Sequence, residues 1–279
     1  MQAHKGEVPE YLAKLEETHA DLVPMADDVA EFRALLRGDL HSHSDWSDGG
    51  SPIREMAEAA IAIGHEYLAL TDHSPRLTVA NGLTAARLER QLDVVAELNE
   101  ELAPFRILTG IECDINVDGS LDQTDELLER VDVVVASVHS DLRAERSAMT
   151  QRMLAAVANP HTDVLGHCTG RLVIGRTQRN GTQRPRPESQ FDAEAVFSAC
   201  VENGVAVEIN SRPERLDPPL RLLSLAVELG CDFAIDTDAH APGQLDWQAG
   251  GCERAVETGV PAERVINTLT AEELLDRLG

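Results

Sequence analysis

GDLHSHSDWSDGG, the stretch from Gly38 to Gly50, is the part of the sequence from which the fold and the chemistry are most readily inferred. His41 and His43 stand two residues apart, and on an extended strand this spacing puts both imidazoles on one face, within reach of one metal ion. Asp45 and Asp48 follow before a Gly-Gly turn. A lone His-x-His pattern is a weak signal, because it also occurs by accident on protein surfaces. Its weight depends on what recurs at the ends of other apolar runs.

The bulk composition bounds the class of protein. The chain has 279 residues, of which 43% are hydrophobic and 26% charged, which fits one large α/β domain or one domain with an appendage. The formal net charge is −25, which favours solubility and argues against passive binding to DNA or to an anionic membrane. The acidic residues are spread along the expected helices, as is typical of a solvated acidic surface.

The N-terminus and the cysteines indicate the compartment. The first ten residues, MQAHKGEVPE, contain no apolar core region, so we expect no signal peptide, and no run approaches the length of a membrane span. The five cysteines include no C-x-x-C pair, and an odd count without a framework is typical of buried thiols in a reducing compartment. We therefore expect a cytoplasmic protein with no membrane partner.

Residues 1–37 differ from the rest of the chain. Two segments, residues 11–22 and residues 26–37, have apolar residues at three-to-four spacing and are expected to be short amphipathic helices. No strand precedes them. We predict that residues 1–37 form a helical N-terminal arm or linker, and that residues 38–279 form the main domain.

From Gly38 onward, short β-rich runs alternate with helical patterns. The expected strands are GDLHSH, YLALTDH, RILTGIECDI, DVVVASVHS, DVLGHCTG, GVAVEIN and CDFAIDTDAH. The expected helices lie at residues 52–63, 84–102, 122–130, 146–158, 192–203 and 219–230. Seven such alternations predict a parallel sheet, and that number in one chain favours a barrel over an open sheet.

Nearly every β-rich run ends in residues that bind metals. The residues are His41 and His43, then His73, then Glu112 with Asp114, then His139, then His167, and finally Asp238 with His240. Barrel enzymes carry their chemistry at the carboxyl ends of the strands, so these side chains are expected to converge at one mouth. Imidazole and carboxylate without thiolate suit Zn²⁺, Mn²⁺ or Fe²⁺. Because the ligands outnumber what one ion needs, two or three divalent ions are implied.

The ordered set H-S-H, S-D-G, T-D-H, G-x-E-x-D, V-H-S, G-H and D-A-H resembles the PHP (polymerase and histidinol phosphatase) family, over essentially all of residues 38–279. The strongest similarity is to the PHP module of bacterial family X DNA polymerases and to stand-alone actinobacterial PHP proteins. No polymerase part is present, and residues 1–37 resemble the linker that would follow one. The resemblance implies an α/β fold, a distorted (β/α)7 TIM-like barrel, with metal-dependent phosphoesterase activity.

The same resemblance implies a trinuclear site. The first ion would be held by His41, His43, Glu112 and Asp238, the second by Glu112, His139 and His167, and the third by Asp48, His73 and His240. Some relatives have histidine in place of Asp48, so the third site is expected to be weaker or to prefer a harder ion. The set is otherwise intact, which argues against a degenerate, purely structural module.

The implied reaction is phosphoester hydrolysis. Two ions roughly 3.5–4 Å apart lower the pKa of a bridging water and clamp the attacking and leaving oxygens. No G-x-S-x-G motif is present, so the expected nucleophile is a metal-bridging hydroxide. Glu112 is the expected bridging catalytic residue, and Asp48 or Asp114 is expected to assist with the proton of the leaving group. Asp72 and Asp236 adjoin ligands and are expected to orient imidazoles.

Arginines near the expected mouth are candidate phosphate ligands. Residues 171–187 contain five arginines and no acid, and their Gly and Pro content predicts a loop, either an exposed insertion or a basic lid over a phosphorylated substrate. Arg171 and Arg212 follow strand ends, and a guanidinium binds phosphate through two parallel hydrogen bonds.

Three functions remain open on the sequence alone. The first is hydrolysis of a small-molecule or nucleotide phosphomonoester. The second is a 3'–5' exonuclease or a DNA 3'-end processing phosphoesterase, and the third is a non-catalytic module that keeps metals for stability. The intact ligand set disfavours the third, and the net charge of −25 disfavours strong DNA affinity, which depends on phosphate contacts. We therefore favour a small phosphorylated substrate over DNA.

Overall fold

A parallel seven-stranded sheet forms the centre of the molecule. The computed structural model describes residues 25–175 and 184–279. The strands follow one another in chain order around the sheet, and every neighbouring pair is parallel. They are β1 (Gly38–Ser42), β2 (Tyr67–Leu70), β3 (Arg106–Asp114), β4 (Val133–Ser137), β5 (Val164–Leu165), β6 (Ala206–Asn210) and β7 (Phe233–Asp236).

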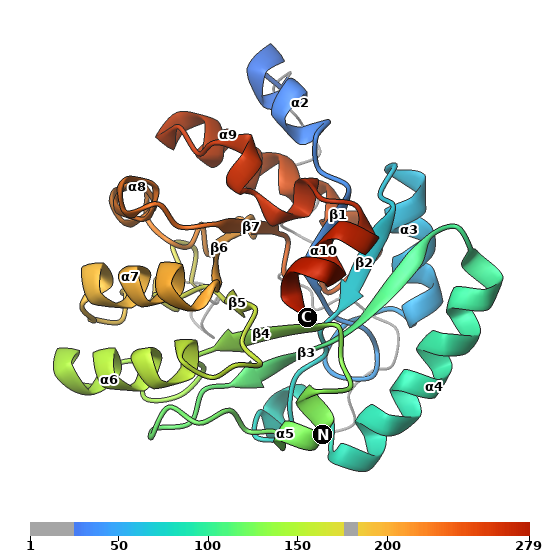
Figure 1. Ribbon diagram of the computed structural model, residues 1–279, viewed down its shortest axis with the longest axis horizontal. Helices are drawn as coiled ribbons and strands as arrows, with labels where there is room; N and C mark the ends of the chain where they lie inside the picture. The colour runs from blue at the N-terminus through green and yellow to red at the C-terminus, as the bar shows by residue number, and fades with distance from the viewer. Residues whose placement is uncertain (1–24, 176–183) are drawn as a thin grey trace.

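The first and last strands meet and nearly close the sheet into a barrel (Figure 1). Ser42 forms a parallel bridge with Ala239, and the amide of His43 donates to the carbonyl of Ala239 over 2.8 Å. In the middle of β1, the amide of Leu40 donates to the Asp236 carboxylate over 2.9 Å. The predicted α/β class and (β/α)7 TIM-like barrel are therefore confirmed.

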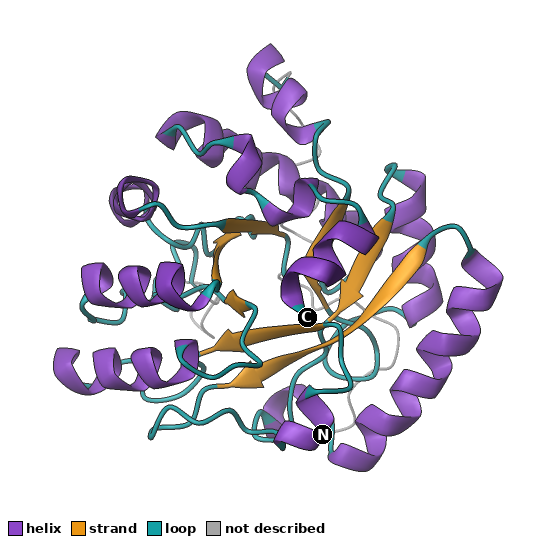
Figure 2. Ribbon diagram, viewed as in Figure 1, coloured by secondary structure: helices purple, strands orange, loops and turns teal. Residues whose placement is uncertain are grey.

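Helices surround the strands on the outside, as Figure 2 shows. The six predicted helices are present as α3 (Ile53–Ala62), α4 (Ala85–Leu102), α5 (Asp125–Leu128), α6 (Arg146–Val157), α7 (Ala193–Asn203) and α8 (Leu220–Leu229). Gly204 and Gly230 end α7 and α8 in the left-handed conformation, with φ of 71° and 87°. Short 3₁₀ turns complete the connections: η1 (Thr78–Ala80), η2 (Pro242–Trp247), η3 (Ala262–Arg264) and η4 (Ile266–Thr268).

Two helices near the C-terminus, α9 (Gln248–Thr258) and α10 (Ala271–Leu278), were not predicted from the sequence. The Gly-Gly pair inside α9 gives a poor helical pattern, because glycine disfavours helix interiors. Packing explains one of these glycines, since a Cβ at Gly251 would lie 2.2 Å from Ser211 Oγ and 2.6 Å from Ile235 Cγ2. Packing against the barrel, rather than local helix propensity, therefore accounts for Gly251 in α9.

Helix α10 closes the amino end of the barrel and lies across its centre in Figure 1. Leu274 is fully buried in the cluster of interior side chains. This cluster contains Leu40, Tyr67, Ala69, Leu108, Val133, Val135, Val164, Ala206, Ala234, Ile266 and Leu274. Beside this cluster, the Asn267 side chain joins strands by hydrogen bonds. Its amide nitrogen donates to the carbonyls of Gly38 and Ile235, and its oxygen accepts from the Ile235 backbone amide. The amino end is thus packed shut, which leaves the carboxyl end for chemistry.

The N-terminal arm is described only in part. Helix α2 (Asp27–Arg33) matches the second predicted arm helix and packs against α9, and Val29 and Leu36 are buried in the main core. The predicted helix at residues 11–22 lies outside the described residues. The division of the chain at residue 37 stays a prediction.

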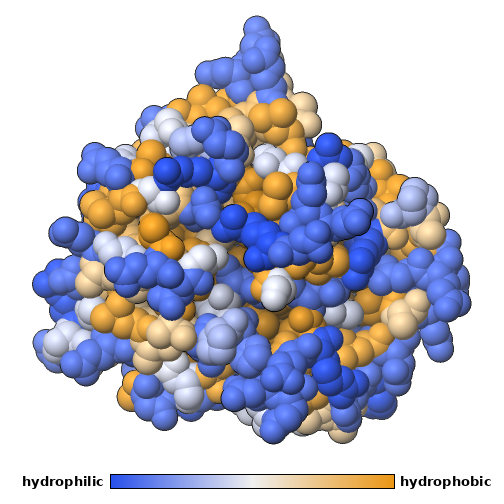
Figure 3. All heavy atoms as spheres, viewed as in Figure 1, coloured by the Kyte–Doolittle hydropathy of each residue, from blue (hydrophilic) through white to orange (hydrophobic). Residues whose placement is uncertain are grey.

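The surface agrees with the acidic composition. Hydrophilic residues are spread over the face drawn in Figure 3, with hydrophobic residues scattered between them. No helix among the described residues is both long enough and apolar enough to span a membrane.

Candidate metal centre

Six imidazoles meet at the carboxyl end of the barrel. They come from β1, the residue after it, and the ends of β2, β4, β5 and β7. Their ring centroids form a chain of close neighbours: His43–His240 at 4.3 Å, His43–His73 at 4.4 Å, His41–His43 at 5.2 Å, His139–His167 at 5.2 Å and His73–His139 at 5.3 Å. The six histidines that follow from the strand ends in the sequence therefore do lie together in one hollow at the carboxyl end of the barrel, here called the cup.

Glu112 lies at the centre of this cup. It belongs to β3, and its side chain is fully buried. Five imidazoles have a ring nitrogen within 4 Å of its carboxylate: His73 (2.8 Å), His167 (3.0 Å), His139 (3.3 Å), His41 (3.4 Å) and His43 (3.7 Å). One carboxylate shared by so many imidazoles has the arrangement expected of a bridging ligand.

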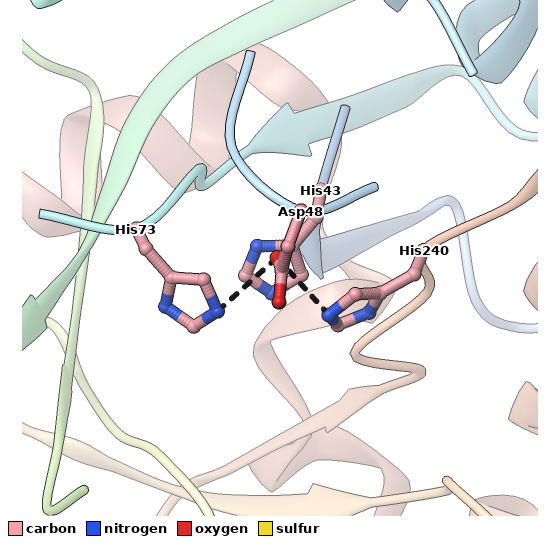
Figure 4. A group of neighbouring side chains, drawn as sticks. All are labelled: His43, Asp48, His73 and His240. Carbon is pink, nitrogen blue, oxygen red and sulfur yellow. Dashed lines mark ion pairs between the residues drawn. The ribbon is translucent and has the colours of Figure 1, made fainter. Parts of the chain in front are cut away.

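Asp48 defines a second focus, at the mouth of the cup. Figure 4 shows its carboxylate between His73 and His240, with His43 behind it. One carboxylate oxygen lies 3.4 Å from Nε2 of His73 and 3.4 Å from Nε2 of His240. Its side chain is 37% exposed, whereas the side chains of His73 and His240 are 7% and 6% exposed. Asp48 is therefore more open to solvent than the other three residues of this group, His43, His73 and His240.

Asp238 follows β7 in a left-handed backbone conformation, with φ of 53°, which is uncommon outside glycine. Its Oδ1 lies 3.3 Å from Nε2 of His43, and its backbone carbonyl accepts from Nδ1 of His240 over 2.8 Å. In this conformation Asp238 contacts two imidazoles: its carboxylate lies near His43, and its backbone carbonyl accepts a hydrogen bond from His240.

The unpaired atoms of the cup fit a set of metal ions. Buried polar atoms are almost always hydrogen-bonded, so a group of unpaired ones needs a reason. Here the buried atoms without a hydrogen-bond partner among the described residues include His41 Nε2, both ring nitrogens of His43, His73 Nδ1, His139 Nε2, His167 Nδ1 and Glu112 Oε2. Imidazole nitrogen and carboxylate oxygen are the donors that Zn²⁺ and similar divalent ions take.

The ligand atoms cluster in three overlapping groups among the described residues. The groups are His41, His43 and Glu112; His73, Glu112 and His139; and His43, Asp48, His73 and His240. In each group the ligand atoms lie within 4.8 Å of one another. The groups share residues with the three predicted ligand sets but place His73 with Glu112 and His139 as well as with Asp48.

Comparison with known proteins identifies the family. The PHP domain matches residues 39–212. This chain belongs to the PHP domain family. It is 38% identical over 258 residues to the DNA polymerase/3'-5' exonuclease PolX of Bacillus subtilis (strain 168), which covers 92% of this chain. The chain spans 43% of the length of that protein.

Two further proteins extend the comparison. A probable phosphatase of Thermoanaerobacter sp. (strain X514) is 28% identical over 246 residues, which is 82% of this chain and 89% of the relative. The histidinol phosphate phosphatase of Lactococcus lactis, solved with zinc, L-histidinol and phosphate, superposes with a TM-score of 0.56 at 20% identity, over 80% of this chain and 92% of that one. The PHP chain thus has the fold predicted for it, and its relatives include proteins named as probable phosphatases.

The electrostatics of the PHP site depend on burial and on close neighbours. Burial, reinforced by His240 and His73, lowers the pKa of His43 to about 3. Burial also disfavours the charged form of His139, but the carboxylates of Glu112 and Asp114 outweigh it and raise the pKa to about 9. For Glu112, burial acts to raise the pKa, yet the surrounding imidazoles hold it well below its usual range. These contacts keep the Glu112 carboxylate ionised and the ring of His43 neutral, which are the protonation states in which such groups can bind a metal ion.

The prediction that Asp72 and Asp236 orient imidazoles is wrong. Asp72 accepts hydrogen bonds from the Ser44 amide and hydroxyl, the Ser47 hydroxyl and the Gln91 amide, so it holds the loop after β1. Asp236 accepts from the Leu40 amide and the Asn267 side chain at the barrel seam. Adjacency to a ligand in sequence was a poor guide, because successive residues on a strand face opposite sides.

Other residues contact the outer nitrogens of the imidazoles. Asp114 accepts from Nδ1 of His139 over 2.7 Å, and its other oxygen lies 3.5 Å from Nε of Arg76. Glu208, which sequence reasoning missed, accepts from Nδ1 of His41 over 2.6 Å. The signal available in the sequence was a glutamate inside the apolar run GVAVEIN, where an acid is buried only with partners.

The two predicted phosphate-binding arginines have different surroundings. Arg171 donates from Nε to the carbonyl of Arg215 over 3.0 Å and also contacts the carbonyl of Leu216. Arg212 is buried, hydrogen-bonded to Glu214, with Nη1 3.3 Å from Asp238 Oδ1. Arg171 therefore faces the backbone of the loop after β6, whereas Arg212 faces Asp238, a predicted ligand. The centre of the predicted basic loop, residues 176–183, lies outside the described residues.

A third arginine, Arg215, was missed by the sequence reasoning. Its Nε donates to Asp238 Oδ2 over 3.0 Å, and its buried Nη1 has no hydrogen-bond partner among the described residues. Its charge also contributes, after burial, to lowering the pKa of His167. It sits three residues beyond Arg212 in a loop whose course could not be read from composition.

Proposed function

We propose that this PHP chain hydrolyses small phosphomonoesters, including nucleotide monophosphates, at a centre built for three divalent ions. The observation that carries the proposal is the ring of imidazoles around Glu112, several of whose buried nitrogens lack hydrogen-bond partners within the described part of the chain. When bound, Zn²⁺, Mn²⁺ or Fe²⁺ would supply Lewis acidity, an activated water and neutralisation of phosphate charge. The predicted cytoplasmic location remains a prediction.

The proposed ligand sets follow the contacts. His41, His43 and Asp238 would hold one ion together with Glu112, and Glu112 would be shared with a second ion held by His139 and His167. Asp48, His73 and His240 would hold the third at the mouth. The two distances of 3.4 Å from Asp48 to His73 and His240 support this last group.

The remaining roles follow from position and charge. Burial acts to raise the pKa of Asp48, but His240 and His73 outweigh it and keep the pKa below its usual range. Asp48 therefore stays ionised at the open side of the cup, where it can hold a water that supplies the proton of the leaving group. Asp114, the alternative candidate, is engaged by His139 and Arg76, which favours an orienting role.

Arg215 and Arg212 are the proposed phosphate ligands. Both guanidinium groups reach Asp238, and Nη1 of Arg215, which has no hydrogen-bond partner in residues 25–175 and 184–279, leaves a donor for a phosphate oxygen. Guanidinium binds phosphate with paired, directional hydrogen bonds. Arg171 would act indirectly, by holding the backbone of residues 215 and 216.

A second candidate is 3'–5' exonuclease or DNA 3'-end processing activity. It is favoured by the 38% identity to the Bacillus subtilis protein named as a polymerase and 3'–5' exonuclease. The net charge of −25 disfavours it, because strong DNA binding needs many phosphate contacts. The third candidate is a non-catalytic metal-stabilised module, and it is disfavoured because the sequence retains every proposed ligand.

One substrate panel separates these functions. The purified chain, loaded with Mn²⁺ or Zn²⁺, is assayed on nucleotide monophosphates, histidinol phosphate, an aryl phosphate and labelled single-stranded DNA with a 3'-hydroxyl or 3'-phosphate. We expect release of inorganic phosphate from the monoesters and little shortening of DNA. Preferential shortening of DNA would replace the first candidate by the second, and no turnover of any substrate by metal-loaded protein would favour the third.

A further inference from the structure

Glu208 is a completely buried carboxylate inside the barrel, beside the proposed metal centre. It lies on β6 two residues after Ala206, which belongs to the interior cluster, so the alternation of the strand points both side chains inward. One oxygen accepts from Nδ1 of His41 over 2.6 Å, and the other accepts from the backbone amide of His167. A buried carboxylate held only by neutral partners would be costly, so its retention here needs a reason.

Two other imidazoles of the cup show a pattern that supplies this reason. Nδ1 of His139 is held by Asp114, and Nδ1 of His240 is held by the carbonyl of Asp238. In both rings Nε2 then faces a carboxylate of the cup, Glu112 at 3.3 Å or Asp48 at 3.4 Å. His41 repeats the arrangement, with Nδ1 held by Glu208 and Nε2 at 3.4 Å from Glu112.

We propose that Glu208 is a positioning residue that fixes the ring of His41 with Nε2 directed at the metal ions and holds the main chain of His167 beside it. The proposal rests on the metal centre of the proposed function and adds a residue outside the ligand set. An acceptor on one ring nitrogen keeps the proton there and leaves the other nitrogen for a metal. Loss of such an outer partner typically lowers metal affinity by about 10–100-fold.

The second oxygen of Glu208 extends its effect to other segments. The Asn210 side-chain amide lies 3.2 Å from Glu208 Oε2 and 3.4 Å from Asp238 Oδ2. Glu208 is therefore joined to His41 on β1, to His167 after β5 and, through Asn210, to Asp238 after β7. One carboxylate thus joins three segments of the barrel that carry proposed ligands, which gives a reason for an acid between the apolar residues Val207 and Ile209 of β6.

The test compares Glu208→Leu and Glu208→Gln with a control, Asp163→Asn. Asp163 also accepts a backbone amide of a neighbouring strand, that of Val134 over 2.7 Å, but it precedes β5 at the opposite end of the barrel. Zn²⁺ and Mn²⁺ affinity is measured by competition with a chromophoric chelator, together with metal content and circular dichroism. We expect Glu208→Leu to lose about 100-fold in affinity and Glu208→Gln, which keeps one acceptor oxygen in place of two, about 10-fold.

The outcomes separate this proposal from the metal centre itself. Wild-type affinity and stoichiometry in Glu208→Leu would overturn the role of Glu208 while leaving the centre intact. An equal loss in Asp163→Asn would also overturn it, because the effect would then not be specific to the cup. Absence of metal binding by the wild-type chain would instead remove the proposed centre.

A measurement on the unaltered protein covers the case in which Glu208→Leu does not fold. Long-range ¹H–¹⁵N spectra of the zinc-loaded chain report which nitrogen of each imidazole carries the proton and which binds metal. We expect His41 to bind through Nε2 with Nδ1 protonated. A His41 ring bound through Nδ1 would overturn the proposal without any substitution.

Discussion

The two ends of the barrel bury polar groups in opposite ways. At the amino end, the Asn267 side chain is saturated by hydrogen bonds to Gly38, Ile235 and Asp236, and Leu274 fills the space below the strands. At the carboxyl end, buried nitrogens of five imidazoles have no hydrogen-bond partner among the described residues. The amino end therefore contributes stability, whereas the carboxyl end keeps unmet polar groups that a ligand must satisfy.

This contrast shows that stability and ligand binding depend on opposite ends of the same barrel. Unpaired buried polar atoms cost free energy, so they persist only where the surrounding structure is firm enough to hold them. The closed amino end and the ring of helices provide that support. Substitutions at the two ends should consequently separate stability from metal binding.

The largest effect is expected at the centre of the carboxyl end. Glu112→Ala should lower the hydrolysis of an aryl phosphate by about 10³-fold or more, because the proposed shared ligand of two ions is removed. Turnover is measured at saturating Mn²⁺, with circular dichroism as the check on folding. Glu112→Gln, which keeps the volume but loses the charge, should be nearly as inactive, and wild-type turnover by either variant would contradict the bridging role.

The amino end should show the converse behaviour. Leu274→Ala should lower the free energy of unfolding by about 2–5 kcal/mol, because it opens a cavity in the barrel interior. Chemical denaturation measures this loss, and metal titration of the same protein should give the wild-type stoichiometry. A Leu274→Ala protein with full stability and impaired metal binding would reverse the proposed division.

A pH titration sharpens the comparison through Asp163, which lies at the amino end. Burial raises its pKa to about 7, although the Val134 amide acts against this. The folded state then retains a proton that the unfolded state loses near pH 4, so the free energy of unfolding falls as the pH rises from about 4 to about 7 and levels off above that. Between pH 5 and pH 8 the wild-type chain should lose roughly 2–3 kcal/mol relative to Asp163→Asn. Parallel curves for the two proteins would show that Asp163 titrates normally.

The smallest predicted effect concerns the arginines at the mouth. Arg215→Met should raise KM for a phosphomonoester by about 10-fold, since a charge-assisted hydrogen bond to phosphate is lost. Arg171→Met, which removes only the side chain that holds the loop backbone, should have a weaker effect. A larger loss in Arg171→Met than in Arg215→Met would reassign the phosphate contact to Arg171.

Much of the fold was accessible from the sequence because its signals are local. Apolar runs of strand length alternate with helical periodicity from β1 to β7, and parallel pairing in chain order follows from that alternation. Helix α9 was missed because its Gly-Gly pair weakens the helical pattern, and the reason for Gly251 is tertiary: its close approach to Ser211 and Ile235. No local pattern contains that information.

The candidate site divides in the same way. The strand ends predicted which imidazoles and carboxylates converge, because that depends only on topology. The outer partners could not be predicted, since Glu208 and His41 are 167 residues apart and meet only across the closed barrel. Asp72 and Asp236 were chosen because they adjoin predicted ligands in the sequence. Asp72 instead holds the loop after β1, and Asp236 instead joins β7 to β1 where the barrel closes.

The most direct test of the account is anomalous scattering from crystals of the chain grown with Mn²⁺ or Zn²⁺. The account predicts at least two anomalous peaks at coordination distance from the ring nitrogens of His41, His43, His139 or His167, with the Glu112 carboxylate between them. Peaks confined to surface residues, with none inside the cup at saturating metal, would contradict it.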